Sequence, residues 1–121
     1  MDTSEIYIKM CERAREIQDV SLSFGDYYWF NKDWHIFLEG AYAISPEHFV
    51  WLPRQDQLQE ILFTHKEHLF PQCVLLREFI REGELYILHF LKSMEQLWLA
   101  FVMYKKFNKI WNGEDWVKEI E

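Results

Sequence analysis

The sequence contains little glycine, proline and cysteine, and each shortage excludes a class of protein. Of its 121 residues, 4 are glycine, 3 are proline and 2 are cysteine. So few glycines and prolines exclude collagen-like and low-complexity chains. Two cysteines are fewer than a secreted disulfide scaffold of this size normally carries. Because Cys11 falls on the apolar side of a predicted helix, we expect a buried free thiol there.

The sequence also lacks an apolar run long enough to span a membrane and a secretion signal. The longest apolar run of the last predicted helix, Leu97 to Tyr104, is far shorter than the ~20 residues that cross a bilayer. The first residues, Met1 to Glu5, are acidic and lack the basic and apolar regions of a secretion signal. The sequence therefore predicts no membrane association and a cytoplasmic localisation.

No motif that defines a reaction class occurs in the chain. A glycine-rich phosphate loop, a dinucleotide-binding fingerprint, a nucleophile elbow and a Cys-x-x-Cys pair are all absent. Their absence favours a protein without a cofactor and without enzymatic activity.

Apolar and aromatic side chains are abundant. Hydrophobic residues make up 50% of the chain and aromatic residues 18%. A chain of this length and composition can bury a sizeable core, and we expect one globular domain over residues 1–121. The net charge of −7 repels phosphate backbones and makes nucleic acid an unfavourable partner.

The spacing of apolar residues predicts an α+β fold, with a small antiparallel sheet of two or three strands packed against three or four helices. Helices are expected at Asp2–Ile17 with Asp2 as its cap, at Pro53–Phe63, from Pro71 to a stop at Gly83, and at Ser93–Trp111. The last helix is apolar on all sides, which places it in the core or against a second subunit. The run Leu85–Leu91 fits a strand or a buried helix equally well.

An aromatic hairpin is the first candidate for function. Strands are expected at Tyr27–Phe30 and Trp34–Leu38 around a turn at Asn31–Asp33, with a third strand at Phe49–Leu52. Both hairpin strands are apolar on both faces. The hairpin is therefore either covered on two sides or presents aromatic side chains, Trp29 and Trp34 among them, to a partner. Tyr27, Trp29, Trp34 and Phe37 would also suit stacking on a nucleic-acid single strand, but Lys32 is the one basic residue among them.

A polar helix start is the second candidate. Arg54, Gln55, Asp56 and Gln57 follow Pro53 without an evident role in the core. They form either a solvated first turn or a site that binds a carboxylate or backbone group of a partner. An exposed turn of this kind predicts that Arg54→Ala changes stability by less than about 0.5 kcal/mol.

Histidines supply a weaker candidate. His65 and His68, three residues apart on one helical face, could chelate a divalent metal, with Cys73 downstream. The alternative is two partly solvated polar residues, because this spacing defines no third or fourth ligand. His35 and His89 lie in apolar runs, where a hydrogen-bonded core histidine is expected.

Several blocks of the sequence resemble a family of short, uncharacterised proteins encoded by bacteriophages and prophages of Gram-positive bacteria. The blocks are Tyr7–Glu12, Glu16–Gln18, Gly25–Asp26, Val50–Gln59, Glu95–Met103 and Trp111–Val117. The residues from His65 to Lys92 depart from the pattern. The resemblance implies a phage context and a cytoplasmic location in the bacterial host cell. It implies no known activity, so it transfers no site residue.

The sequence favours a small phage accessory protein that acts by binding another protein, with a homodimer as one form of the assembly. The residues expected to bind the partner are Arg54, Gln55, Asp56, Gln57, Trp29 and Trp34. Two alternatives remain open: a metal-binding protein or enzyme that uses the His65/His68 region, and a single-strand nucleic-acid binder that uses the hairpin aromatics.

Overall fold

The computed structural model describes residues 1–38, 49–62, 69–83 and 89–118, with the backbone alone for residues 69–73. It confirms the α+β fold: the elements described up to residue 107 follow the predicted order, and a second pair of antiparallel strands that the sequence does not predict comes after them. The helices are α1 (Glu5–Arg13), the 3₁₀ turn η1 (Arg15–Ile17), α2 (Gln55–Leu62), α3 (Leu69–Glu82) and α5 (Met94–Phe107). The strands are β1 (Tyr27–Phe30), β2 (Asp33–Ile36), β3 (Val50–Leu52), β4 (Lys109–Trp111) and β5 (Trp116–Lys118).

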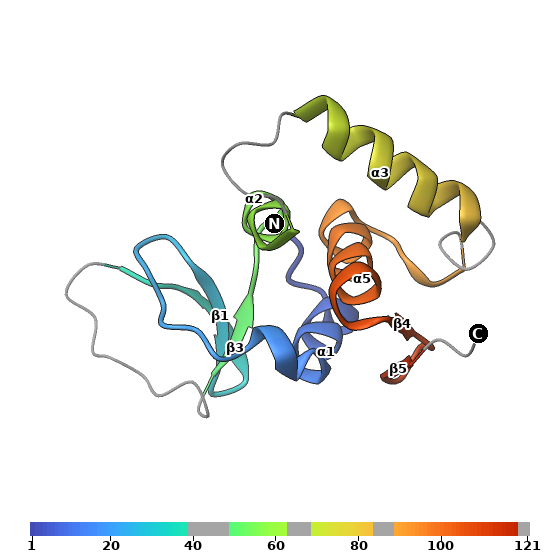
Figure 1. Cartoon of the computed structure of the whole chain (residues 1–121). Helices are drawn as coiled ribbons and strands as arrows, with labels where there is room; N and C mark the ends of the chain where they lie inside the picture. Colours follow the sequence, from blue (N-terminus) through green and yellow to red (C-terminus); the bar gives the residue numbers. More distant parts are fainter. Residues whose placement is uncertain (39–48, 63–68, 84–88, 119–121) are drawn as a thin grey trace.

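The three-stranded sheet lies at one end of the molecule, and the helices lie beside it (Figure 1). Its strand order is β2-β1-β3, and β4 and β5 form a separate hairpin. Helix α1 packs against β3 and α5, while α2 packs along α5. Helix α3 lies on the outer side of α5, where Phe79 stacks on Phe101 with ring centroids 5.1 Å apart. Helix α5 therefore joins the other helices into one core.

Helix α1 begins two residues later than its sequence predicts. The side chain of Ser4, not that of Asp2, caps the helix by accepting the N–H of Tyr7. The predicted helix also breaks at Ala14, after which η1 continues to Ile17. The predicted apolar face is nevertheless buried, because Met10, Ala14 and Ile17 all lie in the core. Cys11 is a buried free thiol, as expected.

Helix α5 confirms the prediction of a helix that is buried centrally. Ser93 caps it by accepting the N–H of Gln96, and Trp98 through Met103 are all buried. The prediction that it continues to Trp111 is wrong. The helix ends at Phe107 because Asn108 adopts a left-handed conformation, and the chain then forms the β4–β5 hairpin. This hairpin returns Trp116 to the core, where its Nε1 donates to the carbonyl of Met10 at 2.9 Å.

The β1–β2 turn has two residues instead of the three that were predicted. Asn31 and Lys32 both have positive φ, which is the backbone of a type I′ hairpin turn. Asp33 accordingly belongs to β2 and pairs with Phe30. The extra paired residue sets the register of the hairpin, and with it the side chains that share each face.

The remaining helix boundaries shift by a few residues. Helix α2 begins at Gln55, two residues after Pro53, and α3 begins at Leu69, ahead of Pro71. Most of the ambiguous run Leu85–Leu91 lies outside the described residues, although His89 and Phe90 are helical.

Candidate interaction surface

One face of the three-stranded sheet carries apolar side chains that the core covers only in part. Tyr27, Trp29 and Val50 on this face are partly buried against the core, and Leu52, which pairs with Tyr27, is fully buried. In the register of β1 and β2, Trp29 lies opposite Trp34 and Tyr27 lies opposite Ile36. On the other side of β1, Trp29 pairs with Val50 of β3. Because side chains alternate along a strand, all five point to the same face. We call these residues, Tyr27, Trp29, Trp34, Ile36 and Val50, the aromatic face.

The opposite face of the sheet belongs to the core where β1 meets β3, whereas Phe30 and Asp33 beside the hairpin turn are exposed on it. Tyr28, Phe49 and Trp51 alternate with the residues of the aromatic face, and all three are buried. Tyr28 meets Phe49 edge to face with ring centroids 6.0 Å apart. By the same alternation Phe37 lies on this face, so the expectation that it shares a stacking surface with Trp29 and Trp34 is wrong.

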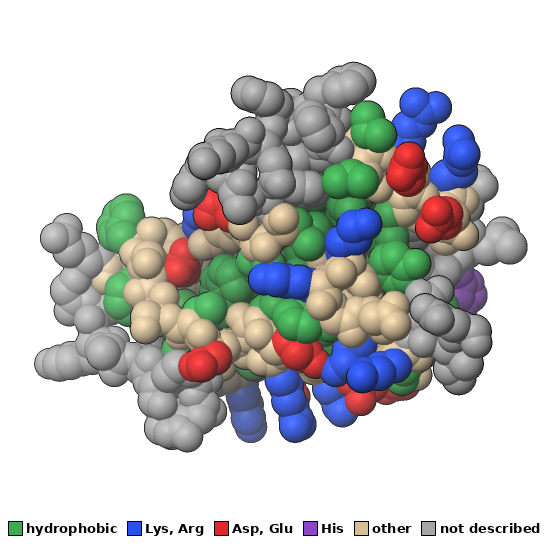
Figure 2. Space-filling model, viewed as in Figure 1, with side chains coloured by type: hydrophobic (Ala, Val, Ile, Leu, Met, Phe, Trp, Pro, Cys, Tyr) green, Lys and Arg blue, Asp and Glu red, His purple; other side chains and the backbone are tan. Residues whose placement is uncertain are grey.

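The residues of β2 are the most exposed members of the aromatic face. Trp34 retains 44% of its accessible surface and Ile36 retains 40%. Of the nine large hydrophobic residues that are exposed in the described part of the chain, five lie between Phe24 and Leu38. Hydrophobic side chains are correspondingly visible at the sheet end of the molecule (Figure 2). The structure thus favours the second of the two expected arrangements, a hairpin that presents apolar side chains.

Arg54 and Gln57 have a structural role that the sequence analysis did not assign to them. Arg54 Nη1 donates to the carbonyl of Gly25 at 2.9 Å and lies 3.8 Å from the carboxylate of Asp26. Gln57 Nε2 donates to Asp26 at 2.6 Å, while its Oε1 accepts the N–H of Arg54 at 2.9 Å. These bonds tie the start of α2 to the turn that precedes β1. Two of the four polar residues expected to bind a partner therefore hold the fold together.

Asp26 was missed by the sequence analysis although it is the centre of this network. Its side chain is buried, and it also accepts the N–H of Ser23 at 2.8 Å. Gly25, with φ of +89°, turns the chain so that the network can form. The Gly25-Asp26 pair is a recognisable turn signal, but its partners lie about 30 residues away and no local pattern could identify them.

Tyr27 belongs to the aromatic face and directly follows the Gly25–Asp26 turn that Arg54 contacts. Its ring stacks on Trp34 with centroids 5.9 Å apart, on the aromatic face. The pKa of the Arg54 guanidinium is raised by its hydrogen bond to Asp56 against the opposing effect of burial, with further contributions from Asp56, Asp26 and Tyr27. Because it contacts Gly25 and Asp26, the residues that directly precede Tyr27, Arg54 lies near one end of the aromatic face, next to the exposed Asp56. Gln55 is the first residue of α2, and the hydrogen bonds described at this helix start do not include its side chain.

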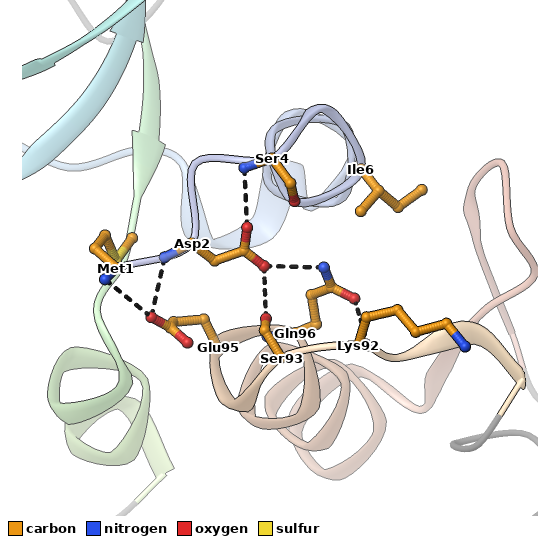
Figure 3. A pocket seen from close by; sticks show the side chains of 8 residues that line it. All are labelled: Met1, Asp2, Ser4, Ile6, Lys92, Ser93, Glu95 and Gln96. Atoms are coloured by element: carbon orange, nitrogen blue, oxygen red, sulfur yellow. Dashed lines mark hydrogen bonds and ion pairs between the residues drawn. The ribbon is translucent and has the colours of Figure 1, made fainter.

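A polar pocket of about 430 Å³ lies at the starts of α1 and α5. Asp2 lies at its centre and accepts bonds from Ser93 Oγ at 2.5 Å, Gln96 Nε2 at 2.9 Å and the N–H of Ser4 at 2.9 Å (Figure 3). The Oε1 of Gln96 accepts the N–H of Lys92 at 2.8 Å. Because these polar groups bind one another, the pocket is a structural joint between the two helices.

The histidine candidates for a metal site fall largely outside the described residues. His65 and His68 lie outside the described residues, as does the side chain of Cys73. The described residues contain no group of three or more His, Cys, Asp or Glu side chains that could hold a metal ion. The expectation of a hydrogen-bonded core histidine is confirmed in part for His35, which is half-buried, bonds to the carbonyl of Phe30 at 3.2 Å and stacks on Tyr28. It is wrong for His89, which is exposed.

Comparisons with protein-family models, with curated proteins and with solved structures found no match to this chain. Within residues 1–38, 49–62, 69–83 and 89–118, no helix is long and apolar enough to cross a membrane. The aromatic face must therefore be interpreted from its own geometry.

Proposed function

We propose that this protein acts by binding another protein through the aromatic face. The observation that carries the proposal is the exposure of Trp34 beside Ile36 at the edge of a small sheet whose other face packs Tyr28 and Trp51 into the core. Large aromatic side chains are enriched where proteins bind one another, and a clustered apolar patch on a small domain marks such a site. We further propose that the partner occurs in a bacterial cell that expresses phage genes, as the resemblance of the sequence to phage and prophage proteins implies.

The charges near the aromatic face favour a protein over a nucleic acid. Lys32 is next to Asp33 at the hairpin turn, and Arg54 is paired with Asp56. No excess of positive charge results, whereas single-strand binding needs a basic groove along its aromatic platform. A protein partner needs no such charge.

A capture experiment with two matched variants tests the proposal. The tagged protein is incubated with lysate of a Gram-positive host, with phage genes on or off, and retained proteins are identified by mass spectrometry. Trp34→Glu places a charge on the aromatic face. Val117→Glu is the control, because Val117 is also an exposed strand residue but lies on β5. Circular dichroism melts establish that both variants fold.

The proposal predicts a protein that the unmodified chain and Val117→Glu retain and that Trp34→Glu loses. Retention that Trp34→Glu does not reduce would overturn the assignment to the aromatic face. Binding of a fluorescent single-stranded oligonucleotide at low salt, lost in Trp34→Glu, would replace the proposal with its nucleic-acid alternative.

A further inference from the structure

The two edges of the three-stranded sheet differ in how they are covered. At the β3 edge, the side chain of Gln18 imitates a neighbouring strand: its Oε1 accepts the N–H of Trp51 at 2.7 Å and its Nε2 donates to the carbonyl of Trp51 at 3.0 Å. At the other edge, β2 pairs with β1 alone in the part of the chain that the structure describes. An unpaired, apolar edge strand is a template for adding another strand.

The hairpin register determines which backbone groups β2 presents outward. Phe30 and Asp33 flank a two-residue turn and therefore form a hydrogen-bonded pair, as do Tyr28 and His35 two residues further on. The ladder continues to Phe37, whose N–H donates to the carbonyl of Asp26 at 2.8 Å. The intervening residues, Trp34 and Ile36, consequently turn their N–H and C=O groups away from β1. In the single chain the N–H of Trp34 donates to Oδ1 of its neighbour Asp33 at 2.8 Å, so a strand added at this edge would take the place of that side chain.

We propose that a second copy of this chain adds its own β2 antiparallel to this edge, which joins the two sheets into one of six strands. The occupant is a strand because the edge offers backbone donors and acceptors as well as apolar side chains. It is a second copy because an antiparallel pair of identical strands has two-fold symmetry, so one edge is complementary to itself. The inference concerns the same hairpin as the proposed function and extends it.

The register of the pair follows from its side chains. With the two-fold axis at His35, Trp34 of each copy lies opposite Ile36 of the partner subunit, and these residues exchange backbone bonds. Apolar side chains then meet on one face. Asp33 lies opposite Phe37 of the partner subunit, so this charge does not face its copy. The two aromatic faces become one continuous surface for the protein partner.

Sedimentation of the purified protein over a concentration series tests the inference directly. We expect a dimer whose dissociation constant rises by about tenfold or more in Ile36→Glu, since the new carboxylate lies against Trp34 of the partner subunit. Val117→Glu is the matched control, because Val117 is 39% exposed and Ile36 is 40% exposed. Val117→Glu should dimerise normally. A monomer at all concentrations, or a dimer that Ile36→Glu leaves intact, would refute the edge pairing.

A cysteine at the symmetry axis tests the register without disturbing the apolar side chains. In the proposed pair His35 occupies a non-hydrogen-bonded position, where facing Cα atoms are about 4.5 Å apart, within the range of a disulfide. His35→Cys should therefore form a covalent dimer under mild oxidation, while Val117→Cys and the unmodified chain should not. Equal cross-linking in all three proteins would contradict the register.

The two proposals can fail separately. A monomeric protein that still captures a partner in a Trp34-dependent manner would overturn the dimer and leave the proposed function standing. A dimer that captures nothing from the lysate would overturn the proposed function and leave the dimer standing.

Discussion

At the scale of single residues, buried or half-buried polar side chains determine where the secondary-structure elements meet. Asp2 joins α1 to the start of α5 through Ser93 and Gln96. Asp26 joins β1 to α2 through Gln57, with Arg54 nearby. Tyr7 is fully buried and donates its hydroxyl to the carbonyl of Pro53 at 2.7 Å, and burial raises its pKa well above the ordinary value. Each of these side chains replaces water with protein hydrogen bonds.

Asp2 should make the stability of the protein depend on acid pH. Burial alone would raise the pKa of Asp2, but hydrogen bonds from Ser4, Ser93 and Gln96 outweigh burial and lower it. A lowered pKa in the folded state adds stability above the unfolded value of about 4, and this stability is lost as the pH falls through the folded value. Asp2→Asn should therefore cost about 1–2 kcal/mol at pH 7 and progressively less below pH ~4.

Urea unfolding between neutral and acid pH measures this difference. Glu12→Gln, which removes an exposed carboxylate from α1, is the control and should change stability by less than about 0.5 kcal/mol. A constant difference between Asp2→Asn and the unmodified protein at every pH would refute a role for the Asp2 charge.

Arg54→Ala should destabilise the protein by about 1–2 kcal/mol, because the Gly25 carbonyl loses its charged donor and the buried Asp26 loses a nearby cation. This revises the smaller change that the sequence alone predicts. Asp56→Ala is the matched control: Asp56 is exposed and pairs with the same arginine, so its removal should cost less than about 0.5 kcal/mol. Equal losses in denaturant melts of the two variants would show that Arg54 acts through Asp56 alone.

At the scale of elements, two left-handed backbone segments decide the course of the chain. Asn31 and Lys32 form the tight turn that pairs β1 with β2. Asn108 ends α5 and sends the chain into the β4–β5 hairpin. Asparagine tolerates this conformation better than most residues, whereas lysine adopts it at a cost. Lys32 is therefore a turn residue whose side chain disfavours the backbone conformation that the turn requires.

Lys32→Gly should stabilise the protein by about 0.5–1 kcal/mol, because glycine adopts a positive φ without the penalty that a side chain incurs. The control is Lys118→Gly, which removes a lysine from strand β5 and should be neutral or destabilising. Midpoints of guanidinium unfolding compare the two variants. A loss of stability in Lys32→Gly would argue against the type I′ turn.

At the scale of the whole molecule, one core connects the elements from both halves of the chain. Tyr7 and Met10 of α1, Trp51 of β3 and Trp98 of α5 belong to the same cluster of buried residues. Trp116 closes the core from the C-terminal hairpin. Because no element buries its apolar side chains alone, we expect the described parts to unfold together.

Trp98→Ala should lower the free energy of unfolding by about 3–5 kcal/mol, since the side chain is 3% exposed and its loss leaves a cavity. Unfolding followed through helix content by circular dichroism and through tryptophan burial by fluorescence should show the same new midpoint. Val117→Ala, on the exposed side of β5, should change the free energy of unfolding by less than about 0.5 kcal/mol in both signals. Midpoints that separate would show that the sheet and the helices unfold independently.

The sequence alone determined the type and order of the elements up to α5, since apolar periodicity and caps such as Ser93 act over a few residues, but it did not predict the β4–β5 hairpin. It also identified the buried α5 and the apolar hairpin. The ends of α1 and α5, the turn at Asn31–Lys32 and the partners of Arg54 and Gln57 were decided only in the tertiary structure. The physical reason is range: side chains such as Asp2 and Asp26 find partners tens of residues away, and hydrogen bonds across that separation leave no local pattern. Likewise, the apolar residues of β2 resemble core residues in the sequence, and only the strand order, with β2 at an edge, exposes them.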